Sequence, residues 1–220
     1  MEKKEFPKKE FSDNVQPSTG GFSSRVFSVI KFIFGVCFLP YVYSTSISFL
    51  KEFSLLDEST QHYFWSGLIS LLIIHLFIWE PVKVYTFGHK LLELIFSFFK
   101  PLVKVAPYLL PIYTLVLFIV YAILSVIFKS QGIINYFIFL FGFSMGLHLI
   151  FSAKSLRTKQ SDFLKANYIF GFSLVYVLNL VLLAVSLNLI FEKFSIVNFF
   201  NNSFCIAGNI FYAIFKQLFL

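Results

Sequence analysis

Five apolar runs, separated by short polar connections, follow a polar N-terminal segment. Each run approaches the length of about 20 residues that a helix needs to cross the hydrocarbon core of a bilayer. Backbone groups inside lipid must be hydrogen-bonded within the chain, which favours helices over isolated strands in these runs. The pattern therefore predicts transmembrane helices at 32–50, 63–79, 105–128, 133–153 and 167–191.

Two further apolar stretches do not fit a simple span. Residues 195–220 carry four asparagines, Lys216 and Gln217, so they are either a sixth span or a helix that lies in the membrane interface. Residues 86–99 are too short to span and lie between charged segments. We predict an all-α integral membrane protein with five or six transmembrane helices and a short half-membrane or interfacial helix at about 86–99.

The N-terminal segment, residues 1–25, is polar and of mixed charge, a composition typical of disorder. We predict a disordered cytoplasmic tail at 1–25 and a polytopic helical membrane domain at 26–220. A cleavable signal peptide has a short apolar core followed by a small-residue cleavage site, and this pattern is absent here. The first span is therefore expected to remain as an anchor.

Composition excludes an ordinary soluble domain. The chain is 58% hydrophobic and only 13% charged, whereas soluble domains have about 25% charged residues. The net charge of +7 comes from lysines and arginines that are dispersed between the apolar runs. Such an excess reflects topology and contact with the headgroups of the lipid bilayer, and no nucleic-acid partner is expected.

The loop charges predict the orientation of the chain. Lysine and arginine together number five in the tail, one in 51–62, four in 80–104, one in 129–132 and four in 154–165. This alternation follows the positive-inside rule. It predicts a multi-pass protein of the cell membrane whose N-terminus, 80–104 and 154–165 face the cytoplasm.

Three of the four histidines fall at one predicted depth, near the cytoplasmic side. His75, His89 and His148 share this level with Glu80 and Glu93. Ionisable groups in a membrane usually face the bundle interior and often mark a functional site. His89 and Glu93 stand four residues apart on a helix and can share a metal ion. Alternatively, each histidine simply hydrogen-bonds to a neighbouring group or extends toward the headgroups.

Prolines, an asparagine and a glycine pair predict how the helices pack. Pro107 and Pro111 should open the start of the third run, so that neighbouring helices must satisfy the freed carbonyls. Asn179 lies in the middle of the fifth run and should hydrogen-bond to another helix. Gly142 and Gly146 form a GxxxG pair that permits close helix contact.

Four sequence blocks, in order, resemble a bacterial branch of the site-2 protease family of intramembrane zinc metalloproteases. In that branch an FGHExxHA helix precedes an APYxxPxY segment, a histidine-bearing helix, a Gln-x-Asp loop and a span with a central asparagine. The resemblance covers about 80–190 and depends on the order of the blocks. They are YTFGHKLLELIF at 85–96, VAPYLLPIYT at 105–114, GLHLIFSAKSLRTKQSDFLKANYIF at 146–170 and LVYVLNL at 174–180.

The sequence departs from this family at the positions that carry its chemistry. His89 keeps the place of the first zinc ligand, but Lys90 replaces the general base and Glu93 replaces the second ligand. A charged lysine cannot accept a proton, and a cation opposes the binding of Zn²⁺. The resemblance thus implies no catalytic residue, with zinc on His89, Glu93 and His148 left as a candidate. Other candidate polar residues are His75, Glu80, Asn179 and Asp162.

These observations favour a pseudoprotease that binds or scaffolds a membrane-protein partner and needs no cofactor. Three alternatives stay open: a membrane zinc metalloprotease with altered ligands, a channel or transporter subunit, and a haem protein ligated by His75 and His148. A transporter would be expected to show an inverted repeat with broken helices, and the sequence shows no such repeat.

Overall fold

The computed structural model describes residues 22–78, 81–98, 106–127, 131–158 and 168–219, and all regular elements in these ranges are helices. The predicted all-α class is confirmed for this part of the chain. The elements are α1 (Phe22–Phe53), α2 (Glu58–Ile73), the π-helical turn η1 (Ile74–Ile78), α3 (Val82–Ile95), α5 (Ile112–Ile127), α6 (Gln131–Thr158), α7 (Tyr168–Ile190) and α8 (Ile196–Phe219).

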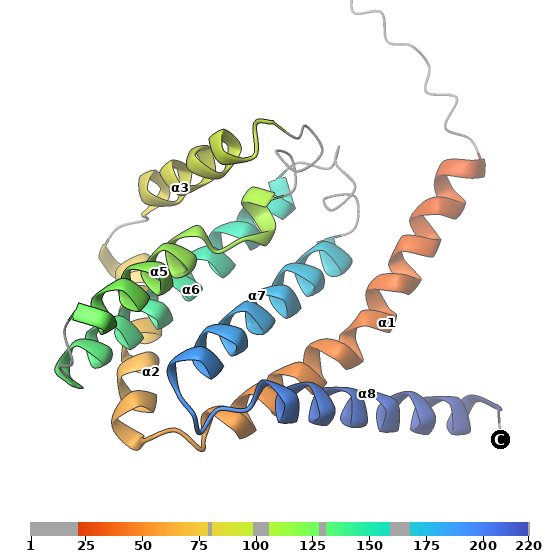
Figure 1. Ribbon diagram of the computed structural model, residues 1–220. Coiled ribbons are helices and arrows are strands. Elements are labelled where there is room, and N and C mark those ends of the chain that lie inside the picture. The colour runs from red at the N-terminus through yellow and green to blue at the C-terminus, as the bar shows by residue number, and fades with distance from the viewer. Residues whose placement is uncertain (1–21, 79–80, 99–105, 128–130, 159–167, 220) are drawn as a thin grey trace, which may run out of the picture.

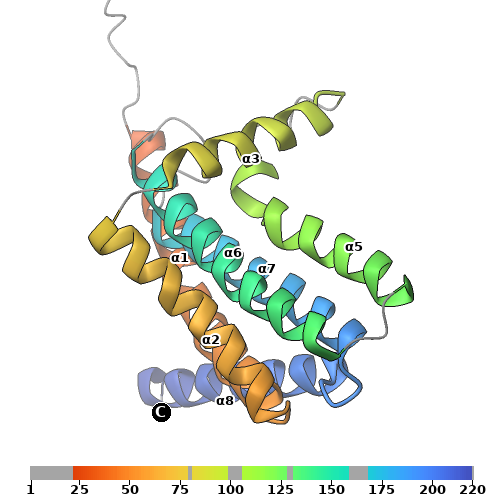
Figure 2. The ribbon, with the colours of Figure 1, turned by 90° about the vertical axis from the view of Figure 1, so that its left-hand side faces the viewer.

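The helices form a bundle with two different ends. Helix α3 lies at one end and α8 lies across the other, while α2, α6 and α7 run between them (Figures 1 and 2). The C-terminal half of α1 packs on α7 and α8, and its N-terminal half extends away from the other helices in Figure 1. We call one end the α3 end; it comprises α3, residues 106–113 and the part of α6 around His148. We call the other the α8 end; it comprises α8 and the turns at 54–57 and 191–195.

Among the described residues, four helices are long and apolar enough to cross a membrane. They coincide with the first, second, fourth and fifth predicted runs, whose helical conformation is confirmed. Their ranges are Phe32–Phe53, Glu58–Ile78, Ile133–Arg157 and Tyr168–Ile190.

The third predicted run, 105–128, is not one continuous helix. A helical turn at 106–109 ends at Leu110 and Pro111, and α5 then has only 16 residues. At 1.5 Å per residue it is about 24 Å long, whereas the hydrocarbon core measures about 30 Å. The break has a clear cause, because Pro111 has no N–H to donate to the carbonyl four residues before it. The prolines therefore act as predicted, and the unbroken span does not form.

Helices α2 and α6 make the closest contact in the bundle, and glycines permit it. A Cβ added to Gly67 would overlap the backbone carbonyl of Phe139, and one added to Gly142 would overlap the carbonyl of Phe64. Gly146 faces the side chain of Leu71, which a Cβ would approach to 2.8 Å. The close helix contact predicted for Gly142 and Gly146 is confirmed, and Gly67 supplies the other half of it.

An aromatic core fills the α8 end. The rings of Phe49 and Phe53 stack with centroids 5.5 Å apart, and Phe53 meets Phe64 at 5.0 Å. Phe194, from the turn before α8, meets Phe49 at 5.9 Å. All four rings are buried. They join α1, α2 and the start of α8 into one packed cluster in which aromatic pairs add to the stability gained by burial.

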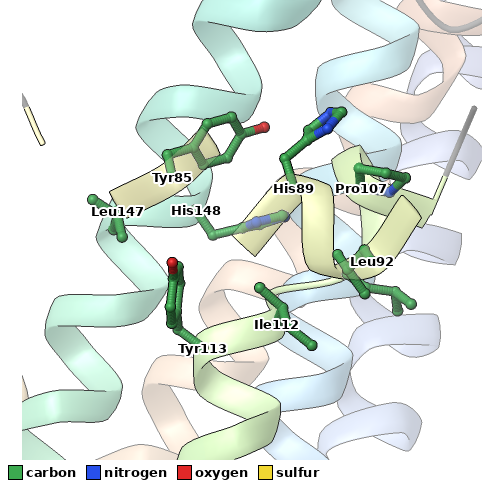
Figure 3. Close-up of a pocket in the computed structure, with 9 residues that line it drawn as sticks. Tyr85, His89, Leu92, Pro107, Ile112, Tyr113, Leu147 and His148 are labelled. Carbon is green, nitrogen blue, oxygen red and sulfur yellow. The ribbon is translucent and has the colours of Figure 1, made fainter. Parts of the chain in front are cut away.

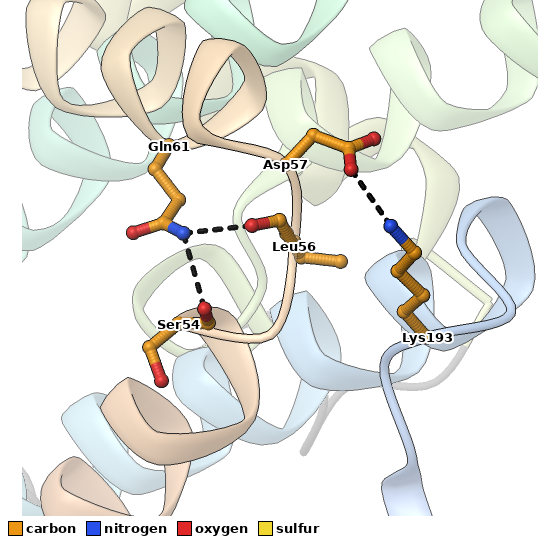
Figure 4. Close-up of polar contacts among 5 residues, drawn as sticks. All are labelled: Ser54, Leu56, Asp57, Gln61 and Lys193. Carbon is orange, nitrogen blue, oxygen red and sulfur yellow. Dashed lines mark hydrogen bonds and ion pairs between the residues drawn. The ribbon is translucent and has the colours of Figure 1, made fainter.

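The α1–α2 turn at this end is closed by its own polar groups (Figure 4). The Gln61 amide donates to the carbonyls of Ser54 at 3.2 Å and Leu56 at 2.8 Å. Both carbonyls belong to the turn that follows α1. Asp57 forms an ion pair of 2.8 Å with Lys193 of the α7–α8 turn, which links the two turns.

The start of α8 is held by three side-chain acceptors. The hydroxyl of Ser195 accepts from the N–H of Asn198, and the amide oxygen of Asn188 accepts from the N–H of Ile196. The carboxylate of Glu52, which is buried, accepts from the N–H of Ser195 at 3.3 Å. A negative charge is favourable near a helix N-terminus, so Glu52 stabilises the position of α8 on the bundle.

Helix α8 settles the conformation of the final stretch, 195–220, as a single helix up to Phe219. It packs on the bundle through Phe199, Ser203 and Ala207, which recur every four residues and are buried. Asn198 and Asn209 point to the opposite side and are exposed.

At the other end of the bundle, α3 is the short helix predicted for about 86–99, although it begins at Val82.

The predicted tail lies mostly outside the described residues. Residues 1–21 are not described, and α1 begins at Phe22, before the predicted boundary at residue 25.

Candidate functional site

Helix α3 lies against α5 and α6 through a narrow buried stripe. Tyr85, Gly88 and Leu92 face inward, and a Cβ on Gly88 would approach the side chains of Ile112 and Tyr113 to 2.8 Å. The Tyr113 hydroxyl donates to the carbonyl of Val84, a second link between α3 and α5. Together these contacts fix the face on which the histidine of α3 is presented.

His89 and Glu93 interact as their spacing predicts. The Nδ1 atom of His89 lies 3.3 Å from a carboxylate oxygen of Glu93. The His89 ring also meets the edge of the Tyr108 ring, with centroids 5.1 Å apart. The imidazole is partly buried, while Glu93 and Lys90 are exposed. Lys90, which stands where the resemblance would place a general base, thus lies on the outer side of α3.

Side chains of α6 and α7 bond to two backbone carbonyls of the segment before α5. His148 Nε2 lies 3.1 Å from the carbonyl oxygen of Tyr108, and the Ser152 hydroxyl donates to the same oxygen at 3.3 Å. The Asn179 amide donates to the carbonyl of Leu109 at 3.1 Å. The prediction that neighbouring helices would satisfy the freed carbonyls is confirmed.

The partner of His148 fixes the position of its proton. A carbonyl oxygen can only accept, so the Nε2 atom carries hydrogen and donates it to Tyr108. Ser152 lies 3.3 Å from the same nitrogen. His148 is buried, and Ser144, one turn earlier, exchanges a hydrogen bond of 2.9 Å with Thr114. A line of polar residues on α6 therefore faces the broken segment and the first turn of α5.

Asn179 is fully buried in α7, and its interhelical hydrogen bond is confirmed. The second amide hydrogen is donated to the carbonyl of Val175 at 2.7 Å. Its Oδ1 atom finds no hydrogen-bond partner among the described residues. The Asn179 amide nitrogen thus donates two hydrogen bonds to the backbone, whereas the amide oxygen accepts none from the described residues.

His89 and His148 line one small cavity, together with Tyr85, Leu92 and Tyr113 (Figure 3). Its volume is about 10 Å³, close to the smallest cavity that holds one water molecule. In Figure 3 the two imidazole rings point in different directions. The structure thus brings His89 and His148 to one cavity, but it leaves between them no room for a peptide.

The other candidate residues are less clearly linked to this cavity. His75 lies in η1 and its ring meets the edge of Phe151 at 5.7 Å. Its Nδ1 atom has no hydrogen-bond partner in the described part of the chain. His75 and His148 thus contact different partners. Glu80 and Asp162 lie outside the described residues.

Each of the three predicted zinc ligands has a polar contact with another group of the chain. His148 uses Nε2 for the Tyr108 carbonyl, and His89 uses Nδ1 toward Glu93. Within the described ranges, no group of three or more histidines, cysteines, aspartates or glutamates is placed to hold a metal ion. We therefore derive no step through zinc, and the zinc site stays a prediction.

Sequence reasoning missed Ser152 and Tyr85. Ser152 follows His148 by four residues and Tyr85 precedes His89 by four, so each shares a helix face with a histidine. The Tyr85 ring lies 6.0 Å from that of His89 and 6.4 Å from that of His148, between centroids. The four-residue spacing was the available signal.

Comparison of the chain with family models, curated proteins and solved structures finds no match.

Proposed function

We propose that this protein is a non-catalytic, multi-pass membrane protein of the site-2 protease type that binds or scaffolds another membrane protein. The observation that carries this proposal is the use of His148 and Ser152 as donors to the Tyr108 carbonyl. These polar groups hold a broken helix in place, a structural task that explains their burial without any reaction.

The surroundings of His89 support the same conclusion. A general base must reach the proton that it abstracts, and in the metalloproteases a glutamate on the metal-bound water does so. Here the corresponding residue is Lys90, which is exposed on the outer side of α3. The cavity beside His89 is also too small to admit a peptide strand.

We place the membrane-protein partner on the exposed face of helix α5. In the described ranges this helix packs mainly on α6, with a smaller contact to α3, and Thr114 is its one buried residue. Ile119, Ile123 and Val126 recur at intervals of three and four residues and are exposed. Such a stripe suits a partner helix, because helices in membranes associate by close packing of their side chains.

Crosslinking in cells tests this surface. A photoreactive phenylalanine analogue at Ile123 is expected to give a discrete protein adduct, because a helix bound on α5 would contact it. The matched control is the same analogue at Phe77 of η1, which is at least as exposed. Equal adducts at both positions, or none at Ile123, would contradict a partner on α5.

The membrane orientation in this proposal follows the charge alternation, with the N-terminus in the cytoplasm. Cysteines placed at Ser54 and Lys129 should react with an impermeant reagent outside intact cells, and cysteines at Ser12 and Ser161 should not. Reaction of the Ser161 cysteine from outside would reverse the orientation.

An altered zinc metalloprotease is the second candidate, because His89 and His148 share a cavity. We expect the purified protein to leave transmembrane substrates uncut and His89→Ala to change only stability or partner binding. Zinc content and cleavage should be measured beside the double variant Lys90→Glu, Glu93→His, which restores the family motif. Cleavage by the unmodified protein that a chelator and His89→Ala both abolish would favour this candidate.

A further inference from the structure

A larger cavity, separate from the histidine cavity, lies between α1, α2, α6 and α7. Its volume is about 220 Å³. Each of the four helices that line it is long and apolar enough to cross a membrane. If these helices span a bilayer as proposed, the cavity lies inside the membrane, where its surroundings are lipid and not water.

The lining of this cavity is unsuited to water. Its two hydroxyl groups, on Ser46 and Tyr176, are 2.9 Å apart and bonded to each other. Ser46 also donates to the carbonyl of Val42, so the Tyr176 hydroxyl is the donor in the pair. Apart from Trp65, the remaining lining residues are leucines, phenylalanines and a methionine. A water molecule needs two to four polar partners, and a cavity without them stays dry.

The cavity has a floor and a mouth. Phe64, Met145 and Leu183 are almost fully buried and form the floor. Leu50 of α1 and Trp65 of α2 also line the cavity, but they are 44% and 38% exposed. The cavity therefore opens between α1 and α2, on the outer surface of the bundle.

Size selects the kind of occupant. A helix with its side chains is about 10–12 Å in diameter, too wide for this space. A dry cavity of about 150 Å³ lined by similar residues holds benzene, so a slender apolar chain fits here. An empty cavity costs free energy in proportion to its volume, because the lining atoms lose their contacts. We propose that the end of an acyl chain of a bilayer lipid enters between Leu50 and Trp65 and fills this cavity.

Photolabelling from the lipid tests this proposal. The full-length protein is reconstituted in phosphatidylethanolamine and phosphatidylglycerol with a trace of phosphatidylethanolamine that carries a diazirine near one acyl-chain end. After illumination, peptide mass spectrometry is expected to find adducts on the floor residues Met145 and Leu183. Lipid on the outer surface cannot reach these two residues, because both are buried.

Filled variants supply the control. Leu180→Phe adds volume inside the cavity and should abolish the floor adducts, whereas Leu189→Phe makes the same change at an exposed position of α7 and should leave them. Leu68→Phe is a second filling variant if the first fails to fold. Floor adducts that persist in a folded, filled variant would overturn the proposal.

The same labelling separates this inference from the membrane placement on which it depends. Ile69 is 50% exposed and lies halfway along the Glu58–Ile78 helix, so an acyl-chain end should label it if this helix crosses a bilayer. Adducts on Ile69 and none on the floor would refute the acyl-chain site and keep the membrane placement. Absence of adducts from both would refute both.

Discussion

The two ends of the bundle satisfy their backbone groups in different ways. At the α8 end, the α1–α2 turn is closed by a side chain nearby in the sequence, because Gln61 bonds to the carbonyls of Ser54 and Leu56. The N–H of Ser195 bonds to the distant carboxylate of Glu52, and a buried aromatic cluster packs at the same end. At the α3 end, a helix is broken, and its carbonyls depend on donors 40 to 70 residues away on α6 and α7.

Side-chain packing thus dominates at the α8 end, and hydrogen bonds from buried polar side chains dominate at the α3 end. The α8 end is held largely by the burial of aromatic rings, and close packing of this kind tolerates few substitutions. The α3 end carries buried polar side chains around a small cavity, and polar residues in membrane proteins are concentrated where function lies. Substitutions at the two ends should therefore differ in size and in kind.

The largest effect is expected from Gly142→Ala. The new methyl would overlap the Phe64 carbonyl, so α2 and α6 must separate, and unfolding should become easier by about 2–3 kcal/mol. Gly88→Ala at the α3 end meets side chains alone and should cost about 1 kcal/mol. Gly208→Ala is the control, since nothing lies within 4 Å. Equilibrium unfolding in detergent, followed by circular dichroism, measures all three, and equal losses at Gly142 and Gly208 would contradict the close contact.

Glu52 tests whether the α8 end depends on one buried carboxylate. Glu52→Leu leaves the Ser195 N–H without its acceptor and should cost about 1.5–3 kcal/mol, the range for hydrogen bonds to charged groups. Glu52→Gln keeps an acceptor oxygen and should cost less. Hydrogen exchange should increase first in α8. Unchanged exchange in α8 of Glu52→Leu would show that the packing of Phe199 holds the helix without the carboxylate.

The α3 end should show coupling between two donors. His148→Phe and Ser152→Ala each leave one donor on the Tyr108 carbonyl and should cost about 0.5–1 kcal/mol. The double variant also leaves a buried acceptor unpaired, a penalty of about 1–3 kcal/mol that neither single variant incurs, so its loss should exceed the sum of the two single losses. Unfolding free energies of the four proteins form a double-mutant cycle. Strict additivity would mean that the two side chains do not share the carbonyl.

Features set by local sequence patterns can be predicted from the sequence, whereas contacts between distant helices cannot. Apolar run length and the need to satisfy backbone groups inside lipid predict the helices, and Pro111 predicts the break in the third run. The i, i+4 spacing predicts the contact of His89 with Glu93. The pairing of His148 with Tyr108 joins residues forty positions apart. It depends on how α6 rotates against the broken segment, which no local pattern specifies. The role of Gly67 was not predicted either, because it depends on the contact with Phe139 of a different helix.

The smallest effect is expected from the ion pair between Asp57 and Lys193. Its N–O distance of 2.8 Å is short, but both side chains are about two-thirds exposed, and exposed pairs typically contribute about 0–1 kcal/mol. Lys193→Met should therefore lower the unfolding free energy by less than about 0.5 kcal/mol at low salt and by still less at 1 M salt, where the Debye length is about 3 Å. Asp57→Asn should behave alike, and the double variant should lose no more than either single variant. A loss comparable to that of Glu52→Leu would show that the charges, and not the aromatic cluster beneath them, fasten the two turns together.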